Sequence, residues 1–206
     1  MNTRLTALAS SVLLLASATA FAGSTVDLTV KGLIVPSACT PSFTGGGVID
    51  HGKISAKDLN PDRSTVIGNH TLSMAINCDA AIQFALHSID NRAASGITTH
   101  YGLGFASDSQ KLGRYSLLLR NPVVEGGTAV QTIGSYDQGN TWFREYIWEP
   151  GMYMSVASMD DTTQPVAVKD LRLDLEVQTI INRADGLDLS NEVTIDGSAT
   201  LEVKYL

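Results

Sequence analysis

The stretch Leu171-Arg172-Leu173-Asp174-Leu175-Glu176-Val177 alternates an apolar residue with a charged one at every step. Successive side chains of a β-strand point to opposite faces, so a period of two predicts a strand with one buried face and one face in water. The 3.6-residue period of a helix does not fit it. The same alternation recurs in five further runs: Val26–Val30, Leu72–Cys78, Ile82–Leu86, Tyr115–Leu119 and Ala199–Tyr205.

Short clusters of glycine, proline, asparagine and aspartate separate these runs. Glycine and asparagine tolerate positive φ and proline fixes φ, so such clusters favour turns. The predicted turns are Gly45-Gly46-Gly47, Asn60-Pro61-Asp62, Gly68-Asn69, Asp90-Asn91, Asn121-Pro122, Gly126-Gly127, Glu149-Pro150-Gly151, Asp185-Gly186 and Asp196-Gly197. Many short strands, glycine-rich turns and no convincing amphipathic helix predict an all-β fold, an antiparallel β-sandwich in one domain over residues 23–206.

The N-terminal residues 1–22 have the pattern of a secretory signal peptide. Arg4 precedes an apolar stretch that runs to Ala20, and Ala20-Phe21-Ala22 has the small-x-small form of a cleavage site. We therefore expect export, with the mature chain beginning near Gly23. The apolar stretch is too short to cross a bilayer, and no later stretch approaches the ~20 apolar residues of a spanning helix, so the mature protein is not expected to be membrane-spanning.

The chain is acidic. It has 14 Lys and Arg against 21 Asp and Glu, a net charge of −7, and loss of Arg4 with the signal peptide would make this −8. Nucleic-acid phosphates are bound by clustered Lys and Arg, and the sequence contains no basic run. We therefore expect no nucleic acid among its partners.

Cys39 and Cys78 are the two cysteines of the chain. In an exported protein an even number of cysteines favours a disulfide, and both lie at the ends of predicted strands, where a bridge can join neighbouring strands. The closed loop of about 40 residues would stabilise the fold by roughly 4 kcal/mol in the chain-entropy account. Two buried free thiols are the alternative.

The two ends of the mature chain have complementary patterns. At the C-terminus, Ala199, Leu201, Val203 and Tyr205 share one face of the predicted last strand. Sandwich edges are usually protected by a further strand, a bulge or charges, and we expect no segment of this chain to cover this one. An uncovered alternating strand suits β-augmentation, in which a partner strand adds main-chain hydrogen bonds and fills pockets with alternate side chains. The stretch from Gly23 to Ile34 is short and alternating, as a donated strand would be.

The termini also resemble those of chaperone–usher pilus subunits. Cys39 follows the segment Val30–Ala38, Cys78 closes a strand, and the C-terminus reads Ala-Thr-Leu-x-Val-x-Tyr-x with Tyr205 penultimate. A less characterised group, the fimbrial-like or β-fimbria major-subunit proteins, is resembled in three further stretches: Tyr101–Gly104, Lys111–Tyr115 and Asp196–Glu202. The likeness spans the mature chain.

This resemblance implies an immunoglobulin-like sandwich that lacks its final strand and is completed by a donor strand. It implies that a periplasmic chaperone fills the groove first, contacting Leu201, Val203 and Tyr205. The N-terminal extension of another copy or subunit, carrying Val26, Leu28 and Val30, would replace the chaperone at an outer-membrane usher. The protein would then pass through the periplasm into a fimbrium on the cell surface, as a structural subunit in cell adhesion.

Each terminus also has a plainer interpretation. Val26–Val30 would be the first strand of a complete sandwich, and Ala199–Tyr205 an ordinary last strand with one edge in solvent. Under that interpretation the isolated mature protein is a stable monomer, whereas a chain that needs a donor strand is unstable or aggregates without one.

No residue pattern points to catalysis. The four histidines, His51, His70, His87 and His100, do not have metal-ligand spacing, and Gly45-Gly46-Gly47 lacks the Lys-Ser/Thr that follows a phosphate loop. A Gly-x-Ser-x-Gly nucleophile elbow does not occur. We therefore expect no metal, no cofactor, no catalytic residue and no enzymatic activity.

Aromatic residues gather in Trp142-Phe143-Arg144-Glu145-Tyr146-Ile147-Trp148. As one strand, this segment would place Trp142, Arg144, Tyr146 and Trp148 on a common face. Exposed, that face could stack on a sugar or a partner surface, which gives the alternative function of a carbohydrate-binding adhesive or periplasmic module. Buried, the same side chains would be the core of a strand pair.

Overall fold

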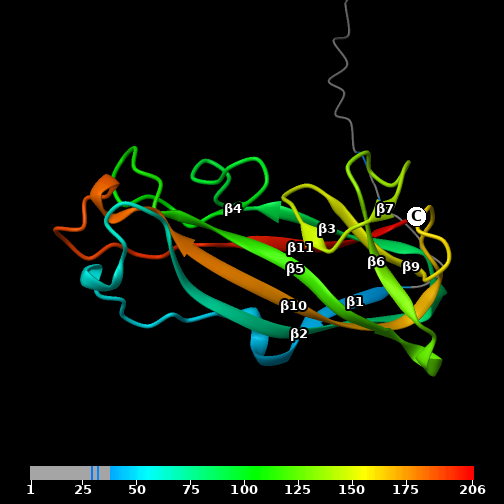
Figure 1. Cartoon of the computed structure of the whole chain (residues 1–206). Helices are drawn as coiled ribbons and strands as arrows, with labels where there is room; N and C mark the ends of the chain where they lie inside the picture. Colours follow the sequence, from blue (N-terminus) through cyan, green and yellow to red (C-terminus); the bar gives the residue numbers. More distant parts are fainter. Residues whose placement is uncertain (1–28, 30–31, 33–37) are drawn as a thin grey trace, which may run out of the picture. The chain divides into compact units, whose positions relative to one another are not determined.

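A computed structural model of the chain describes residues 29, 32 and 38–206 (Figure 1). The chain divides into two units, residues 1–34 and 35–206. The predicted signal peptide and the predicted donor residues Val26, Leu28 and Val30 lie outside the described residues. The fold described below is that of residues 38–206.

Two antiparallel sheets make up this unit. The first sheet has the order β1-β2-β10-β5-β4, with β8 also paired to β5. Its strands are β1 (Cys39–Phe43), β2 (Thr65–Ile82), β10 (Val168–Ile181), β5 (Gly113–Val124), β4 (Tyr101–Gly102) and β8 (Ile147–Trp148).

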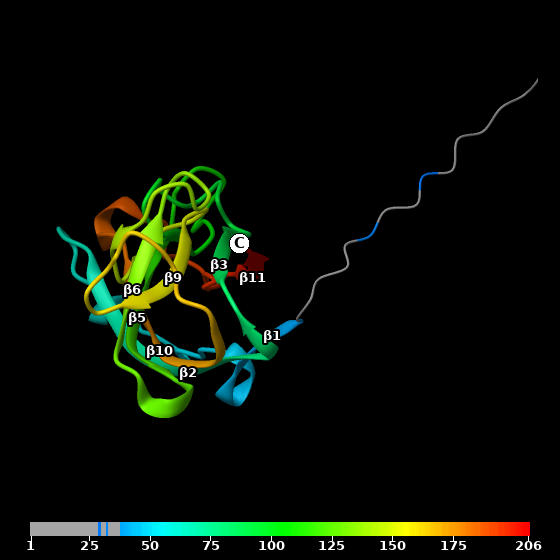
Figure 2. The same ribbon diagram turned by 90° about the vertical axis from the view of Figure 1, so that its right-hand side faces the viewer.

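The second sheet has the order β11-β3-β9-β6-β7. Its strands are β11 (Ala199–Tyr205), β3 (Phe84–Asp90), β9 (Tyr153–Ser158), β6 (Val130–Ser135) and β7 (Phe143–Arg144). Short 3-10 turns in the described residues are η1 (Thr44–Gly47), η2 (Ala56–Asp58), η3 (Glu125–Gly127) and η4 (Ala184–Gly186). Figure 2 views the two sheets from one end, with the core between them.

The inner faces carry the side chains that the period of two selects. On β10, Leu171, Leu173, Leu175 and Val177 are 1–6% exposed, whereas Arg172 on the alternate face is exposed. Apolar side chains from the second sheet, including those of β3 and β9, belong to the same buried cluster. The prediction of an all-β antiparallel sandwich is therefore confirmed.

Gly68-Asn69 was wrongly predicted as a turn. The pair lies inside β2, which continues from Thr65 to Ile82. Gly68 is required there for close packing, because a Cβ at this position would lie 2.8 Å from His70 Nε2 and 2.9 Å from His51 Cε1. The glycine marks two imidazoles packed against the strand and does not end it.

Asn121-Pro122 was also predicted as a turn but lies inside β5. The pairing with β10 moves from Arg172↔Val123 to Asp174↔Arg120, so two residues of β5 oppose one of β10. This is a β-bulge, which accommodates a proline without an N–H and the positive φ of 49° at Asn121. The turn residues bend the strand without reversing it.

The run Ile82–Leu86 is not one strand. β2 ends at Ile82 and β3 begins at Phe84, and these strands belong to different sheets. Between them, the side-chain amide of Gln83 donates to the carbonyl of Pro165 at 2.6 Å. The chain therefore changes sheets within a run whose alternation continues unbroken.

Candidate functional site

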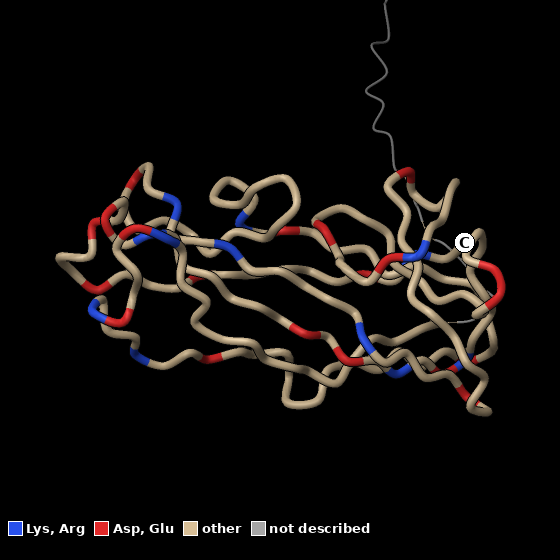
Figure 3. Tube along the Cα trace, viewed as in Figure 1, with Lys and Arg blue, Asp and Glu red and all other residues tan. Residues whose placement is uncertain are grey.

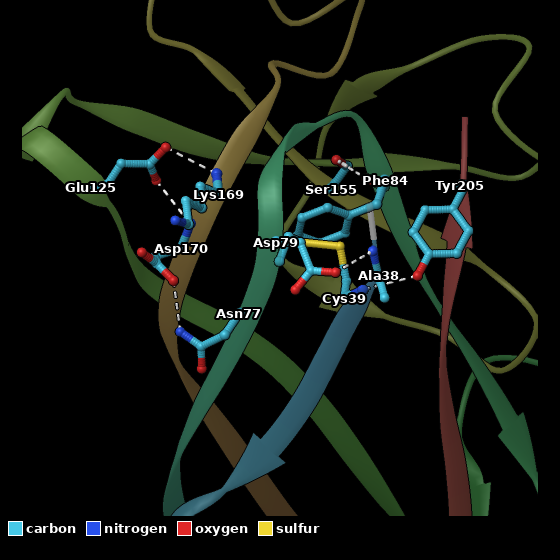
Figure 4. The surroundings of a disulfide bond; sticks show 11 residues. Ala38, Cys39, Asn77, Asp79, Phe84, Glu125, Ser155, Lys169, Asp170 and Tyr205 are labelled. Atoms are coloured by element: carbon cyan, nitrogen blue, oxygen red, sulfur yellow. Dashed lines mark hydrogen bonds between the residues drawn. A yellow bond between two sulfur atoms is a disulfide. The ribbon is translucent and has the colours of Figure 1, made fainter. Parts of the chain in front are cut away.

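The predicted disulfide joins Cys39 of β1 to Cys78 of β2 (Figure 4). The two cysteines are directly paired in the antiparallel register of these strands. Beside them, the amide of Ala38 donates to the Asp79 carboxylate at 3.2 Å, and the amide of Asp79 donates to the Ala38 carbonyl at 3.0 Å. The bridge therefore fixes β1, a strand of five residues, to the long strand β2.

Strands β1 and β11 are the end strands of their respective sheets and lie on the same side of the sandwich (Figure 2). They approach each other at one point, where the Cys39 amide donates to the Tyr205 hydroxyl at 2.9 Å (Figure 4). This bond joins the two sheets through a side chain and not through a ladder. The remaining edge of each strand is therefore available for a further strand.

The unpaired backbone groups of β11 belong to its odd-numbered residues. At the two ends of the β3–β11 pair, the Asn91 amide donates to the Ser198 carbonyl and the Leu206 amide donates to the Gln83 carbonyl. Hydrogen-bonded positions alternate along an antiparallel pair, so the even-numbered residues of β11 face β3. The N–H and C=O groups of Ala199, Leu201 and Val203 point away from β3, where no strand of the described residues pairs with them.

The edge of β1 follows the same rule. The Asp79–Ala38 bond makes the even-numbered residues face β2, so Cys39, Pro41 and Phe43 face the opposite side. Pro41 has no N–H to leave unpaired there, which is the usual place for proline on an edge strand. The open edges of β1 and β11 therefore both lie on the same side of the sandwich.

Apolar side chains along this side are only partly covered. Val203 pairs with Leu86 of β3, yet Leu86 is 1% exposed while Val203 is half-buried. Likewise Phe43 pairs with Met74 of β2, which is 1% exposed, and Phe43 remains half-buried. Each half-buried residue lies on an end strand, whereas its buried partner lies on the neighbouring inner strand. The core therefore lacks side chains that would cover the end strands on this side.

A groove lies along this incomplete side. It consists of two adjoining hollows, of about 290 Å³ and about 570 Å³, both lined by Ile49, His51 and Ile195. Phe43 of β1 and Leu201 of β11 line the first hollow, whereas the second lies beyond the two strands and is lined mainly by residues from 49–59 and 189–195. The walls combine apolar side chains that contact the main core, such as Ile49, with polar ones such as His51 and Thr179. We call this feature the β1–β11 groove.

The charged residues of β11 lie on the face away from the groove, since they alternate with the core-facing residues. The Lys204 ammonium lies 2.6 Å from the Glu202 carboxylate, which also contacts His87 of β3 at 3.4 Å. Hydrogen bonding to Lys204 lowers the pKa of Glu202, and the same contact raises the pKa of Lys204. β11 contains no proline and its pairing with β3 has no register shift, so two of the usual protections of an edge strand are missing, and its charged side chains leave the groove side apolar.

The predicted chaperone-facing residues Leu201, Val203 and Tyr205 thus lie together on the groove side of β11. Ile49, Phe43 and Ile195 also line the groove but were not selected from the sequence. Phe43 lies just beyond Cys39 in an alternating segment, which is a usable signal. Val193 and Ile195 alternate with Glu192, Thr194 and Asp196, which is also a usable signal, whereas nothing local marks Ile49.

The aromatic segment does not form one strand. Residues Phe143–Arg144 belong to the second sheet and Ile147–Trp148 to the first, so the chain crosses between sheets within it. Trp148 is 0% exposed in the main core, and Trp142 is 9% exposed in a separate cluster. Arg144 and Tyr146 are exposed, so the four residues do not share one surface. A ligand-binding role for them stays a prediction.

The described residues contain neither a metal-ion cluster nor a membrane-spanning helix. In residues 29, 32 and 38–206, no group of three or more His, Cys, Asp or Glu side chains could hold a metal ion. Within the same residues, no helix has the length and apolar character needed to cross a membrane. Acidic and basic positions are interspersed along the Cα trace of the described residues (Figure 3).

The fold and groove define an antiparallel β-sandwich with one disulfide and one incomplete side. Residues 28–100 match the model of a family described as a protein of unknown function (DUF1120). The chain is 25% identical to the uncharacterized protein YhcF of Escherichia coli (strain K12), over 90% of this chain and 92% of that protein. It is 26% identical to protein GltF of the same organism, over 92% of each chain. The similarity therefore extends over nearly whole chains and is not confined to one motif.

Proposed function

We propose that this protein is a structural fimbrial subunit that is exported and assembled by accepting a β-strand into the β1–β11 groove. One observation carries the proposal: Ala199, Leu201 and Val203 have both their unpaired backbone groups and their half-buried side chains directed at the groove side. A strand bound there would satisfy the backbone and cover the side chains together.

The energetics favour a strand over a small ligand. Fully burying a large aliphatic or aromatic side chain contributes about 1.5–3 kcal/mol, so covering the exposed half of one contributes roughly 1 kcal/mol. Phe43, Leu201, Val203 and Ile195 are each partly buried against the core, and a continuous extended segment can reach all of them. This assembly requires no covalent chemistry.

The occupant we propose is the N-terminal segment of another copy or subunit, with Val26, Leu28 and Val30 as its inward-facing residues. A periplasmic chaperone would hold the groove until an outer-membrane usher exchanges it for that segment, and the fibre would lie on the cell surface. The support is the alternation of this segment and its apolar character, which match the alternation of β11.

The test uses residues 23–206 carrying Leu28→Asp, which can accept a strand but places a charge in its own donor segment. Addition of a peptide spanning Gly23 to Val35 is expected to raise the melting temperature. The same peptide with Leu28→Asp is the matched control and should leave it unchanged. A melting temperature that is high and does not respond to the wild-type peptide would contradict the proposal.

Amide hydrogen exchange gives a residue-level readout of the same experiment. The amides of Leu201 and Val203 face the open edge, whereas those of Glu202 and Lys204 face β3. Peptide binding should therefore slow exchange at Leu201 and Val203 much more than at their two neighbours. Equal slowing at all four would indicate general stabilisation without strand pairing.

A second candidate function is carbohydrate binding outside the groove. Its observation is that Tyr146 is 42% exposed, with the Arg120 guanidinium 4.0 Å from its ring centre. An exposed aromatic ring beside a cation can stack on a sugar. Glycan-array binding that is lost in Tyr146→Ala and kept in Leu28→Asp would support this function, and an array without binding would remove it.

A further inference from the structure

The inner face of β2 changes character along the groove. Towards the disulfide it carries Leu72, Met74, Ile76 and Cys78, and in the other direction the next two inward positions are His70 and Gly68. His51, from the loop between η1 and η2, packs against His70 with ring centres 5.0 Å apart in a T-shaped arrangement. His51 thus lines the groove, and His70 packs beside it on β2.

This pair is held by specific contacts. His51 Nε2 lies 3.1 Å from the hydroxyl of Thr179 on β10, and Thr179 is 3% exposed. Both rings rest over Gly68, which offers no Cβ and pairs with Thr179 in the register of β2 and β10. His51 lines both hollows of the groove, so a strand lying along the groove would pass over it.

Few charged groups could compensate a proton on this pair. Asp50 is exposed, and its carboxylate accepts from the Gly52 amide of its own loop at 2.8 Å. Further along the groove, Lys53 and Glu192 contact each other at 3.5 Å and are almost fully exposed. In the first hollow the remaining ionisable lining residue is Tyr115, whose pKa is raised by burial.

Burial is the largest cause that lowers the pKa of His51, and the neighbouring His70 lowers it further, while Asp50 acts in the opposite direction. A strand lying over the pair would remove more water from both rings. The charged form of an imidazole loses more hydration free energy than the neutral form when water is removed. Binding of a strand and binding of a proton therefore oppose each other at this place.

We infer that His51, which contacts His70 and Thr179, makes the β1–β11 groove pH-sensitive, so that the groove holds a strand when the His51 ring is neutral and releases it when that ring takes up a proton. This inference rests on the proposed function, because it concerns the strand that the groove accepts.

The test measures binding of the fluorescently labelled peptide Gly23 to Val35 to residues 23–206 carrying Leu28→Asp, by anisotropy. Between about pH 7.5 and about pH 5, where histidine titrates, Kd is expected to weaken by roughly tenfold. Adding His51→Gln should reduce this change to less than about twofold, because glutamine is polar but does not titrate. The matched control is His100→Gln, since His100 does not line the groove. It should keep the full change.

The outcomes separate this inference from the proposed function. Peptide binding with the same Kd at both pH values overturns the pH sensitivity and leaves the strand-accepting groove in place. No binding at either pH overturns both. Loss of the pH dependence in His100→Gln also overturns the assignment to His51.

A second measurement covers the case in which the His51→Gln variant does not fold. The imidazole proton signals of His51 are titrated by NMR in the Leu28→Asp chain, with and without the peptide. Because linkage is reciprocal, bound peptide should shift the titration midpoint of His51 to lower pH. An unchanged midpoint with bound peptide overturns the inference.

Discussion

The two long sides of the sandwich are closed in different ways. On the side of β5, β7 and β8 the chain itself crosses between the sheets, and Trp148 fills the space with no exposed surface. On the side of β1 and β11 the sheets are joined by the hydrogen bond from the Cys39 amide to the Tyr205 hydroxyl. The same alternating pattern therefore gives a complete core on the side where a further segment covers the inner side chains. It gives a groove on the side where none of the described residues covers them.

The largest expected loss in the free energy of unfolding comes from a substitution on the closed side. Trp148→Ala should lower the free energy of unfolding by about 4 kcal/mol, because it removes a large buried side chain and leaves a cavity. It also removes the indole N–H that donates to the Met152 carbonyl at 3.0 Å. Urea denaturation measures the loss. A change below about 1 kcal/mol would mean that the closed side is not tightly packed.

The next largest difference is expected when a leucine on each side is shortened to alanine, because the loss in the free energy of unfolding should be greater on the closed side. Leu119 of β5 is 2% exposed and does not line the groove, whereas Leu201 is half-buried on the groove side. Leu119→Ala should cost about 3 kcal/mol and Leu201→Ala about 1 kcal/mol in the chain without peptide. Denaturation is repeated with saturating strand peptide, where the cost of Leu201→Ala should approach that of Leu119→Ala. Equal costs without peptide would show that the two sides do not differ.

Tyr205→Phe tests the single contact that joins the open edges. It removes the hydroxyl that accepts from the Cys39 amide at 2.9 Å and keeps the ring. We expect a loss of about 1 kcal/mol, the usual net value of one hydrogen bond, measured by thermal unfolding. Tyr146→Phe, at an exposed tyrosine away from the groove, is the control and should have no measurable effect. A similar loss in both variants would argue against a special role for Tyr205.

The smallest effect concerns the loop after β6. The Asp137 carboxylate accepts from the Thr141 hydroxyl at 2.6 Å, the Thr141 amide at 2.9 Å and the Ser135 hydroxyl at 2.8 Å. These bonds lower the pKa of Asp137 to about 2. Because the unfolded pKa is higher, this stabilisation is present above about pH 4 and is lost as pH falls towards about 2. The stability of the wild type relative to Asp137→Asn, measured by acid titration, should decrease over that window. A constant difference would contradict it.

Much of the fold follows from local alternation. The runs at Leu171–Val177 and Tyr115–Leu119 lie within strands, because a period of two needs no information from distant residues. Gly68-Asn69 was misread because the reason for the glycine lies in two imidazole rings, that of His70 two residues further along β2 and that of His51 from the loop between η1 and η2. Asn121-Pro122 was misread because a bulge and a turn use the same residues.

Only part of the β1–β11 groove could be predicted from the sequence. β11 could be selected because its alternation is complete, and Cys39 because of the disulfide. Which strands become neighbours is decided by the order of strands in each sheet, and no local pattern records that order. Ile49 lines the groove for this reason without any local signal in the sequence. The two tryptophans were assigned a common face because the change of sheet between Phe143 and Ile147 has no local mark.

Trp142 has a consequence for how copies of this domain could meet. It packs with Ala85, Ile133 and Ala157, which lie on three strands of the second sheet and alternate with the core-facing residues there. The loop that carries Trp142 therefore covers part of the back of that sheet with its own side chain. Face-to-face stacking of copies on this sheet would have to displace it. Strand addition at the rim meets no such obstacle, so growth from this domain would extend as a line of linked units and not as layers.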